Sequence, residues 1–169
     1  MTTFVAKPFS IFILIMKKLF PFLTLLLVTL SCLKDDGGRV EPYISLLKSG
    51  NFNIWNMPVF EISDIPQLLK HVRNETHIYV DVNNTISSAL QLQKLDTTIG
   101  MMALWTIEGT RLDTDRPSAG PVVVNCSMQN IPQKEVAGLY ERWWKKNKGK
   151  SFAQLKEISP FEETDYSWH

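Results

Sequence analysis

The sequence predicts a mainly α-helical domain, either a compact bundle or a short HEAT-like helical array, with one or two minor β-strands. Apolar residues at helical spacing recur along residues 40–169, with proline near several segment starts and glycine near several segment ends. Residues 77–82, "HIYVDV", alternate as a half-buried strand does. A signal segment over residues 1–31 and a flexible tether over residues 32–39 precede this single domain.

The N-terminal segment has the layout of a secretory signal peptide. Lys17 and Lys18 provide a positive start, and an apolar run extends from Leu19 to Leu30 before a small residue and a cysteine. A transmembrane helix needs roughly twenty apolar residues. This run is shorter, so the sequence favours a cleaved signal over a permanent membrane helix.

Residues 1–15 add a second apolar patch upstream of the lysines, which no ordinary signal start contains. We therefore expect translation to begin at Met16. If residues 1–15 are translated, the two lysines lie near the middle of a longer apolar stretch.

The end of the signal, "LVTLSC", resembles the lipobox of bacterial lipoproteins. The resemblance implies that Cys32 becomes the first mature residue and carries acyl chains that bind the membrane. Thr29 and Leu30 depart from the commonest lipobox pattern. Several acyl chains, at about 0.8 kcal/mol per buried methylene, would anchor a soluble domain durably.

The next residues, "LKDDGG", resemble the export signal that follows the lipidated cysteine in Bacteroidetes lipoproteins of the outer cell surface. Lys34, Asp35 and Asp36 would form that signal. The segment also reads as a solvated, glycine-containing tether. We therefore expect the domain to be anchored to the outer membrane and to face the cell exterior. The alternative is that it faces the periplasm.

Composition excludes one class of partner. Cleavage before Cys32 removes three lysines, so 15 basic residues remain against 17 acidic ones and the net charge becomes −2. Nucleic-acid binding needs a strongly basic face, so no nucleic-acid partner is expected.

Cys126 would be the one cysteine left unmodified in the mature chain, which excludes an intrachain disulfide. Its apolar, β-branched surroundings in "PVVVNCSM" predict a buried, inert thiol.

Three segments of the first half have distinct patterns. Residues 40–50 predict a helix, with Tyr43, Leu46 and Leu47 on one face and Gly50 at its end. The following irregular segment should plug the core with aromatic side chains, namely Trp55 and Phe60. Residues 63–74 predict a second helix, capped by Ser63 or Asp64 and with an apolar face made of Ile65, Leu68, Leu69 and Val72.

The segment from Thr97 to Thr114, "TTIGMMALWTIEGTRLDT", contains a helix that is apolar nearly all round, which predicts the central, buried helix. Asp96 is a candidate N-cap for this helix. Glu108 and Arg111, three residues apart, are placed to pair.

The last third contains a second candidate strand and two helices. The strand runs from Val122 to Cys126. Residues 132–149 form the best-marked helix, with a favourably ordered Glu141–Lys145 pair. Residues 151–158 form a short helix capped by Ser151, and the tail should pack on the body through Phe161, Tyr166 and Trp168.

Two tryptophans, Trp55 and Trp144, are candidates for ligand binding. Trp144, with Trp143, suggests a stacking surface for sugar rings, but both belong to an apolar helical stripe that core packing explains. Trp144 lies at the edge of that stripe. An exposed aromatic patch around Trp55 or Trp144 would favour binding, whereas a pocket that gathers His71, His77 or several acids would favour chemistry.

No metal, cofactor or catalytic site is expected. His71 and His77 are six residues apart across a helix end, which is not a zinc-ligand spacing. Asp113 and Asp115 offer oxygen ligands without the rest of a calcium loop. No catalytic sequence motif occurs. "DTT" at 96–98 resembles a Bacteroidetes O-glycosylation motif with Thr97 as acceptor.

Several stretches, among them "YISLLKSGNFN", "ALWTIEGTRL" and "ERWWKKNKGKSF", resemble a family of uncharacterised small lipoproteins from gut Bacteroidetes. The resemblance implies a single lipid-anchored domain and assigns no catalytic residue. We expect a binding or accessory module that engages a glycan or a partner protein. The alternative is an envelope enzyme or inhibitor whose site is assembled from residues far apart in the sequence.

Overall fold

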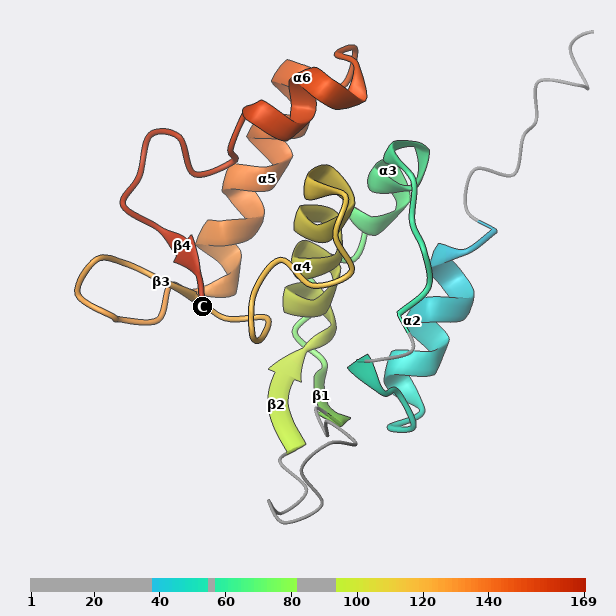
Figure 1. Cartoon of the computed structure of the whole chain (residues 1–169). Helices are drawn as coiled ribbons and strands as arrows, with labels where there is room; N and C mark the ends of the chain where they lie inside the picture. The colour runs from blue at the N-terminus through green and yellow to red at the C-terminus, as the bar shows by residue number, and fades with distance from the viewer. Residues whose placement is uncertain (1–37, 55–56, 82–93) are drawn as a thin grey trace, which may run out of the picture. The chain divides into compact units, whose positions relative to one another are not determined.

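A single helix, α4 (Ile99–Leu112), lies at the centre of the domain, with the other helices around it (Figure 1). The computed structural model describes residues 38–54, 57–81 and 94–169. Twelve residues of α4 are buried. A helix that is apolar on all sides can keep its side chains away from water only when it lies inside the protein. This confirms the predicted central helix. Its N-cap is Thr98, whose hydroxyl accepts from the Met101 amide at 3.1 Å, and not Asp96.

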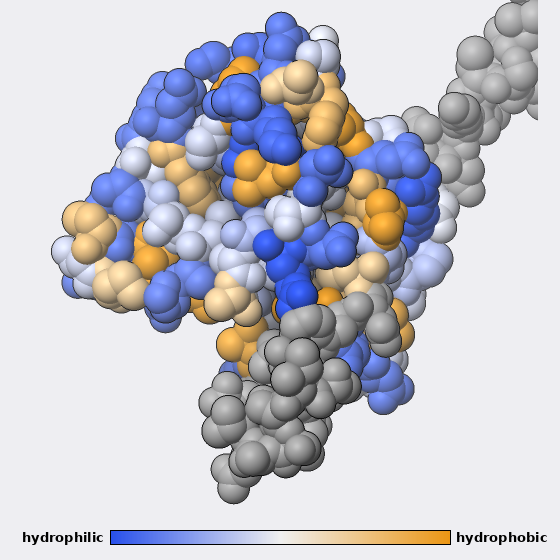
Figure 2. All heavy atoms as spheres, viewed as in Figure 1, coloured by the Kyte–Doolittle hydropathy of each residue, from blue (hydrophilic) through white to orange (hydrophobic). Residues whose placement is uncertain are grey.

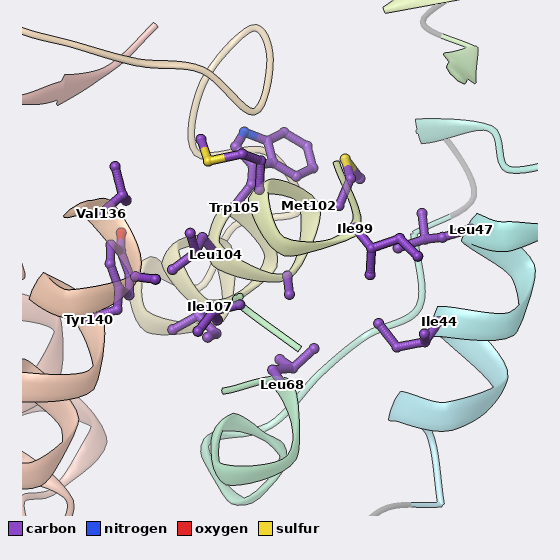
Figure 3. Packing of buried hydrophobic residues seen from close by; sticks show 14 of the residues in the cluster. Ile44, Leu47, Leu68, Ile99, Met102, Leu104, Trp105, Ile107, Val136 and Tyr140 are labelled. Carbon is purple, nitrogen blue, oxygen red and sulfur yellow. The ribbon is translucent and has the colours of Figure 1, made fainter. Parts of the chain in front are cut away.

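The core is built by helices that reach α4 from opposite sides. Ile44 and Leu47 come from α2 (Val40–Lys48), and Val136 and Tyr140 come from α5 (Gln133–Asn147) (Figure 3). All four side chains belong to one apolar cluster with α4. The hydrophobic effect of burying these faces holds the helices together.

Helix α2 follows the prediction with one change of face. Tyr43 and Leu47 are buried together with Ile44, whereas Leu46 is 38% exposed. With Val40, which is also buried, these residues have the i, i+3, i+4, i+7 spacing of a single helical face. Gly50, with φ of +70°, follows the helix as expected, because glycine adopts the left-handed region without strain.

The second predicted helix is much shorter than expected. A 3-10 turn, η2 (Ile62–Asp64), leads into α3 (Ile65–Leu68), and the chain then continues in turns. Of the two predicted caps, Asp64 and not Ser63 occupies the N-cap position of α3, although its side chain makes no cap bond to that helix. The Asp64 side chain instead forms a reciprocal capping box with Glu61 around η2. Phe60, Leu69 and the buried Val72 still pack on the core, so the predicted apolar face is retained.

The strands make the fold mixed, although helix-rich, with about 45% of the described residues in helices and 12% in the strands of two small sheets. Strand β1 (His77–Asp81) is confirmed and pairs antiparallel with β2 (Lys94–Thr98), with Val80 opposite Leu95. Strand β2 was not predicted, since "KLDTT" has a single apolar residue and no alternation. The expectation of a helix-rich domain is confirmed, while the two small sheets hold more strands than the one or two minor strands predicted.

The second sheet fastens the C-terminal tail to the body. Strand β3 (Val123–Val124) pairs antiparallel with β4 (Ser167–Trp168). Phe161 is buried, and Tyr166 and Trp168 pack against the core, as the sequence predicted. Strand β3 ends early because the Asn125 side chain begins a turn, accepting from the amides of Ser127 and Gln129.

The prediction of a buried Cys126 is wrong. The residue is exposed, because the same turn carries it away from the strand. The Asp165 carboxylate, which the Cys126 amide approaches at 3.2 Å, raises the pKa of the thiol above its usual value. The thiolate is therefore disfavoured at this site.

Helix α5 buries Val136, Tyr140 and Trp143, with Leu139 and Trp144 half-buried, which confirms the predicted stripe. The predicted Glu141–Lys145 pair is not formed. Arg73 instead donates twice to the Glu141 carboxylate, at 2.7 and 2.6 Å, and lowers the pKa of Glu141. A bidentate guanidinium contact explains that preference.

Helix α6 (Phe152–Glu157) begins as predicted. Ser151 caps it and forms a capping box with Gln154.

Two glycines in helices test how tightly the core is packed. A Cβ on Gly100 would lie 2.6 Å from the Val72 carbonyl oxygen, whereas one on Gly138 would meet only the end of the Arg142 side chain at 3.3 Å. Gly100→Ala should therefore lower the free energy of unfolding by about 1–3 kcal/mol. Gly138→Ala should raise it by about 0.5–1 kcal/mol, since alanine favours helix. Urea unfolding followed by tryptophan fluorescence measures both, and equal effects would contradict the packing described.

Candidate functional site

Most of the predicted site residues lie outside the described part of the chain, namely Cys32, Lys34, Asp35, Asp36 and Trp55. The structure therefore adds nothing about them. Lipidation, the export signal and the role of Trp55 stay predictions.

The two other predicted site residues, Trp144 and Thr97, are largely covered by the fold. Trp144 is half-buried against the core and tilted on Trp143 at a centroid distance of 5.9 Å, so only part of its ring is open to a ligand. Thr97 lies in β2 and is 8% exposed. A glycosyltransferase needs access to the hydroxyl, so modification of Thr97 would have to precede folding.

The histidines pair with separate acids and do not meet. His71 Nε2 lies 3.0 Å from Glu41 Oε1, and His77 Nδ1 lies 3.1 Å from Asp96 Oδ1. Within the described ranges, no cluster of histidine, cysteine and acidic side chains is suited to hold a metal ion. Among the described helices, none has the length and apolarity to cross a membrane.

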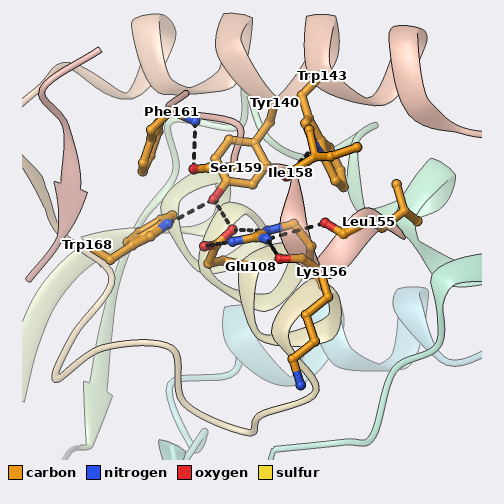
Figure 4. A network of polar contacts seen from close by, with 10 residues as sticks. Glu108, Tyr140, Trp143, Leu155, Lys156, Ile158, Ser159, Phe161 and Trp168 are labelled. Atoms are coloured by element: carbon orange, nitrogen blue, oxygen red, sulfur yellow. Dashed lines mark hydrogen bonds and ion pairs between the residues drawn. The ribbon is translucent and has the colours of Figure 1, made fainter. Parts of the chain in front are cut away.

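A buried polar network joins α4 to α5, α6 and the tail (Figure 4). Arg111 donates to both oxygens of Glu108, at 2.6 and 3.0 Å, which confirms the predicted pair. Tyr140 donates to Glu108 at 2.7 Å and accepts from Trp168 Nε1 at 2.9 Å. Arg111 also donates to the Lys156 carbonyl at 2.6 Å and to that of Leu155 at 3.3 Å.

This network is structural. Glu108 and Arg111 are buried, and their charges are matched by each other and by hydrogen bonds. Burial, together with the negative charge of Glu108, raises the pKa of Tyr140 well above its usual value. The Tyr140 hydroxyl therefore stays protonated and is already committed to a partner, so it offers no proton to a substrate.

A pocket of about 310 Å³, here called the α4 pocket, lies between the irregular segment 57–60 and the C-terminal part of α4. The segment contributes an apolar wall, including Val59, which is 73% exposed. The opposite wall is polar and contains two aspartates. Its residues are Thr106, Gly109, Thr110, Asp113, Thr114 and Asp115.

Local backbone geometry shapes the α4 pocket. Asp113 adopts a left-handed conformation with φ of 58°, which turns the chain back at the end of α4. The Thr114 amide then donates to the Gly109 carbonyl at 3.0 Å. A Cβ on Gly109 would lie 2.6 Å from the Thr114 carbonyl oxygen, so this close approach requires glycine.

The α4 pocket combines hydroxyl and carboxylate groups with exposed apolar surface. The Thr106 hydroxyl is engaged with Tyr43 at 2.9 Å and with the Met102 carbonyl at 2.8 Å, whereas Asp113 and Asp115 are exposed. No histidine lines the pocket. Asp113 and Asp115 bring two carboxylates to one wall of the pocket, an arrangement that can attract a cationic group.

Sequence patterns pointed to the aspartates but not to the pocket. "DTD" at 113–115 was notable as a pair of loop acids, whereas Val59 gave no signal at all. The two walls are about fifty residues apart in the chain, and only folding brings them together.

A second, smaller pocket, here called the α5 pocket, lies where the C-terminal part of α5 meets the chain after α6. Its volume is about 230 Å³. Its lining contains apolar side chains, four charged side chains and Asn147.

Residues 36–169 match the model of a protein family described as a domain of unknown function (DUF4943). No curated protein and no solved structure matches the chain. The predicted membership of an uncharacterised domain family is thereby confirmed, and the match assigns no activity.

The buried ion pair can be tested by removing one or both charges. Arg111→Met leaves the Glu108 carboxylate buried without its counter-ion, so the free energy of unfolding should fall by about 3–5 kcal/mol. Glu108→Leu combined with Arg111→Met should recover most of that loss. Arg73→Met, which breaks the exposed Glu141 pair, serves as the control and should cost no more than about 1 kcal/mol. Equal effects of Arg111→Met and Arg73→Met in urea unfolding would show that the buried pair is not required.

Proposed function

We propose that this chain, which belongs to the DUF4943 family of domains of unknown function, is a lipid-anchored binding protein of the bacterial outer membrane. In this proposal, a compact helical bundle formed by α2, α4 and α5 presents the α4 pocket to the cell exterior. The pocket receives a basic side chain from a partner protein. The combination of exposed Val59 with two aspartates at one pocket is the observation that carries the binding role.

The proposed anchor rests on the sequence. The apolar run, the cysteine that ends it and the acidic tether after it have the order found in surface lipoproteins. A chain held by acyl groups at Cys32 places its domain within a short tether length of the membrane. A partner at the same surface then meets the domain at a high effective concentration.

The proposed ligand follows from the two walls of the α4 pocket. The carbonyl end of α4 carries a partial negative charge, which adds to the charges of Asp113 and Asp115. Val59 and its neighbours offer contact to an aliphatic stem. A lysine or arginine side chain has both parts, a cation on an apolar stem.

The face of the domain drawn in Figure 2 has no single large apolar surface. In Figure 2, apolar residues form small separate patches among hydrophilic ones and not one continuous apolar face. A large apolar interface of the kind found in permanent complexes is therefore not visible in this view. A reversible contact centred on one side chain fits a pocket of about 310 Å³.

The anchor is tested in cells of a Bacteroidetes host. Cys32→Ala should move the protein from the membrane fraction to the soluble fraction, because no acyl chain can be attached. Replacing Lys34, Asp35 and Asp36 by alanine should leave the protein in the membrane fraction but protect it from protease added to intact cells. Fatty-acid labelling of the Cys32→Ala variant would disprove the anchor, and unchanged protease accessibility of the triple variant would disprove the export signal.

Binding at the α4 pocket is tested with a fluorescent pentapeptide that has a central lysine flanked by valines. Fluorescence anisotropy should show binding to the detergent-solubilised full chain. The same peptide with a central glutamate should bind at least about tenfold more weakly, because charge-assisted hydrogen bonds are lost.

Asp113→Asn combined with Asp115→Asn should weaken the lysine peptide by a similar factor, and asparagine tolerates the left-handed conformation at 113. Glu157→Gln combined with Glu75→Gln removes the same charge from exposed positions outside the pocket and should change little. Equal binding of the lysine and glutamate peptides, or of both double variants, would rule out the proposed site.

A further inference from the structure

Asn147 presents an acceptor that has no partner. The residue is 2% exposed, near the end of α5. Its Nδ2 donates to the Trp143 carbonyl at 2.8 Å, which fixes the orientation of the amide, because the opposite orientation would place two oxygens together. Its Oδ1 is buried and accepts no hydrogen bond from the described residues. A buried acceptor without a donor costs about 1–3 kcal/mol.

Asn147 forms part of the lining of the α5 pocket, where charges of both signs also gather. Arg142 and Lys146, one turn apart, lie on the α5 wall. Glu162 and Glu163 lie on the opposite wall, in the turn after α6. All four are exposed, and none belongs to a salt bridge with another residue in the part of the chain that the structure describes.

The rest of the lining is apolar. It consists of one face of α5 and the start of the chain that follows α6, with the residues Leu139, Trp143, Ile158 and Pro160. Trp143 Nε1 donates to the Ile158 carbonyl at 2.9 Å, which holds the two walls together. The pocket volume of about 230 Å³ is below the roughly 300 Å³ at which sites for drug-sized ligands begin.

We propose that the α5 pocket binds a free α-amino acid with an apolar side chain. The carboxylate pairs with Arg142 and Lys146, and the ammonium group pairs with Glu162 and Glu163. One ammonium N–H supplies the donor that Asn147 Oδ1 lacks. This oxygen is closed to solvent in the free protein, so the pocket lining shifts when the ligand binds. The side chain of the ligand lies on the apolar part of the lining.

Other classes of ligand match the pocket less well. A simple anion would meet Arg142 and Lys146 but also the repulsion of two glutamates, and a simple cation would meet the reverse. Sugar binding relies on an open aromatic face, and Trp143 is buried. A zwitterion with adjacent opposite charges satisfies both walls and the orphan oxygen together.

This site is separate from the α4 pocket in its lining residues and in its ligand. If no amino acid bound at the α5 pocket, the proposed binding of a partner at the α4 pocket would still stand. Loss of partner binding at the α4 pocket would likewise leave the proposal for the α5 pocket standing.

Isothermal titration calorimetry of the full chain in detergent, with L-leucine, L-methionine and L-phenylalanine as probes, tests the site. We expect at least one of the three to bind. Two blocked forms of the amino acid that binds are then compared with it: the amide, which lacks the carboxylate, and the N-acetyl form, which lacks the ammonium group. Each should bind at least about tenfold more weakly, since each loses charge-assisted hydrogen bonds. Binding by none of the three amino acids, or equal binding of the blocked forms, would overturn the proposal.

Variants locate the binding in the α5 pocket. Asn147→Leu removes the orphan acceptor at similar volume, so affinity should fall about tenfold or more while the melting temperature stays the same or rises. Lys146→Gln should weaken binding by a comparable factor, whereas Lys148→Gln, which changes another exposed lysine outside the pocket, should not. If Asn147→Leu unfolds the protein, the comparison of the two lysine variants still tests the site. Equal affinities of Lys146→Gln and Lys148→Gln for the amino acid would overturn the proposal.

Discussion

The buried contact between Glu108 and Arg111 is the constraint on which the C-terminal half of the fold depends. A buried ion pair does not by itself make a protein more stable than apolar residues of the same shape would, because both charges lose their hydration. Once the charges are present, however, each must keep its partners. Arg111 reaches the carbonyls of Leu155 and Lys156, and Glu108 reaches Tyr140. These directional contacts set where α5, α6 and the tail lie on α4 in a way that apolar packing alone does not.

The same helix separates a structural face from an open one. Glu108 and Arg111 point to α5 and α6, whereas Thr106, Gly109 and Thr110 line the α4 pocket on another side. The structural face also defines the second pocket, because Arg111 holds the end of α6 and the chain that leaves it forms one wall there. Loss of the ion pair should therefore disturb the α5 pocket more than the α4 pocket.

Local signals in the sequence predicted local structure well. Apolar spacing predicted α2, α4 and α5, the Ser151 cap predicted the start of α6, and spacing alone predicted the contact between Glu108 and Arg111. What depended on distant partners was missed. Except for Cys126, which the local turn at Asn125 carries out of the core, these features are long-range contacts: Glu141 pairs with Arg73 instead of Lys145, and β2 pairs with β1. Both pockets are of this second kind, since each wall comes from a different part of the chain.

The pairing of polar groups distinguishes the two kinds of buried site. In the network around Glu108, donors and acceptors of four side chains match, so nothing remains for a ligand to satisfy. Around Asn147, an acceptor is left over beside charges of both signs that do not pair with each other. Folding gains from the hydrogen bond that Asn147 Nδ2 donates to the Trp143 carbonyl, but it leaves Oδ1 without a donor. A ligand that brings one donor and two opposite charges supplies the missing stabilisation, which is why the unpaired groups are more informative about function than the paired ones.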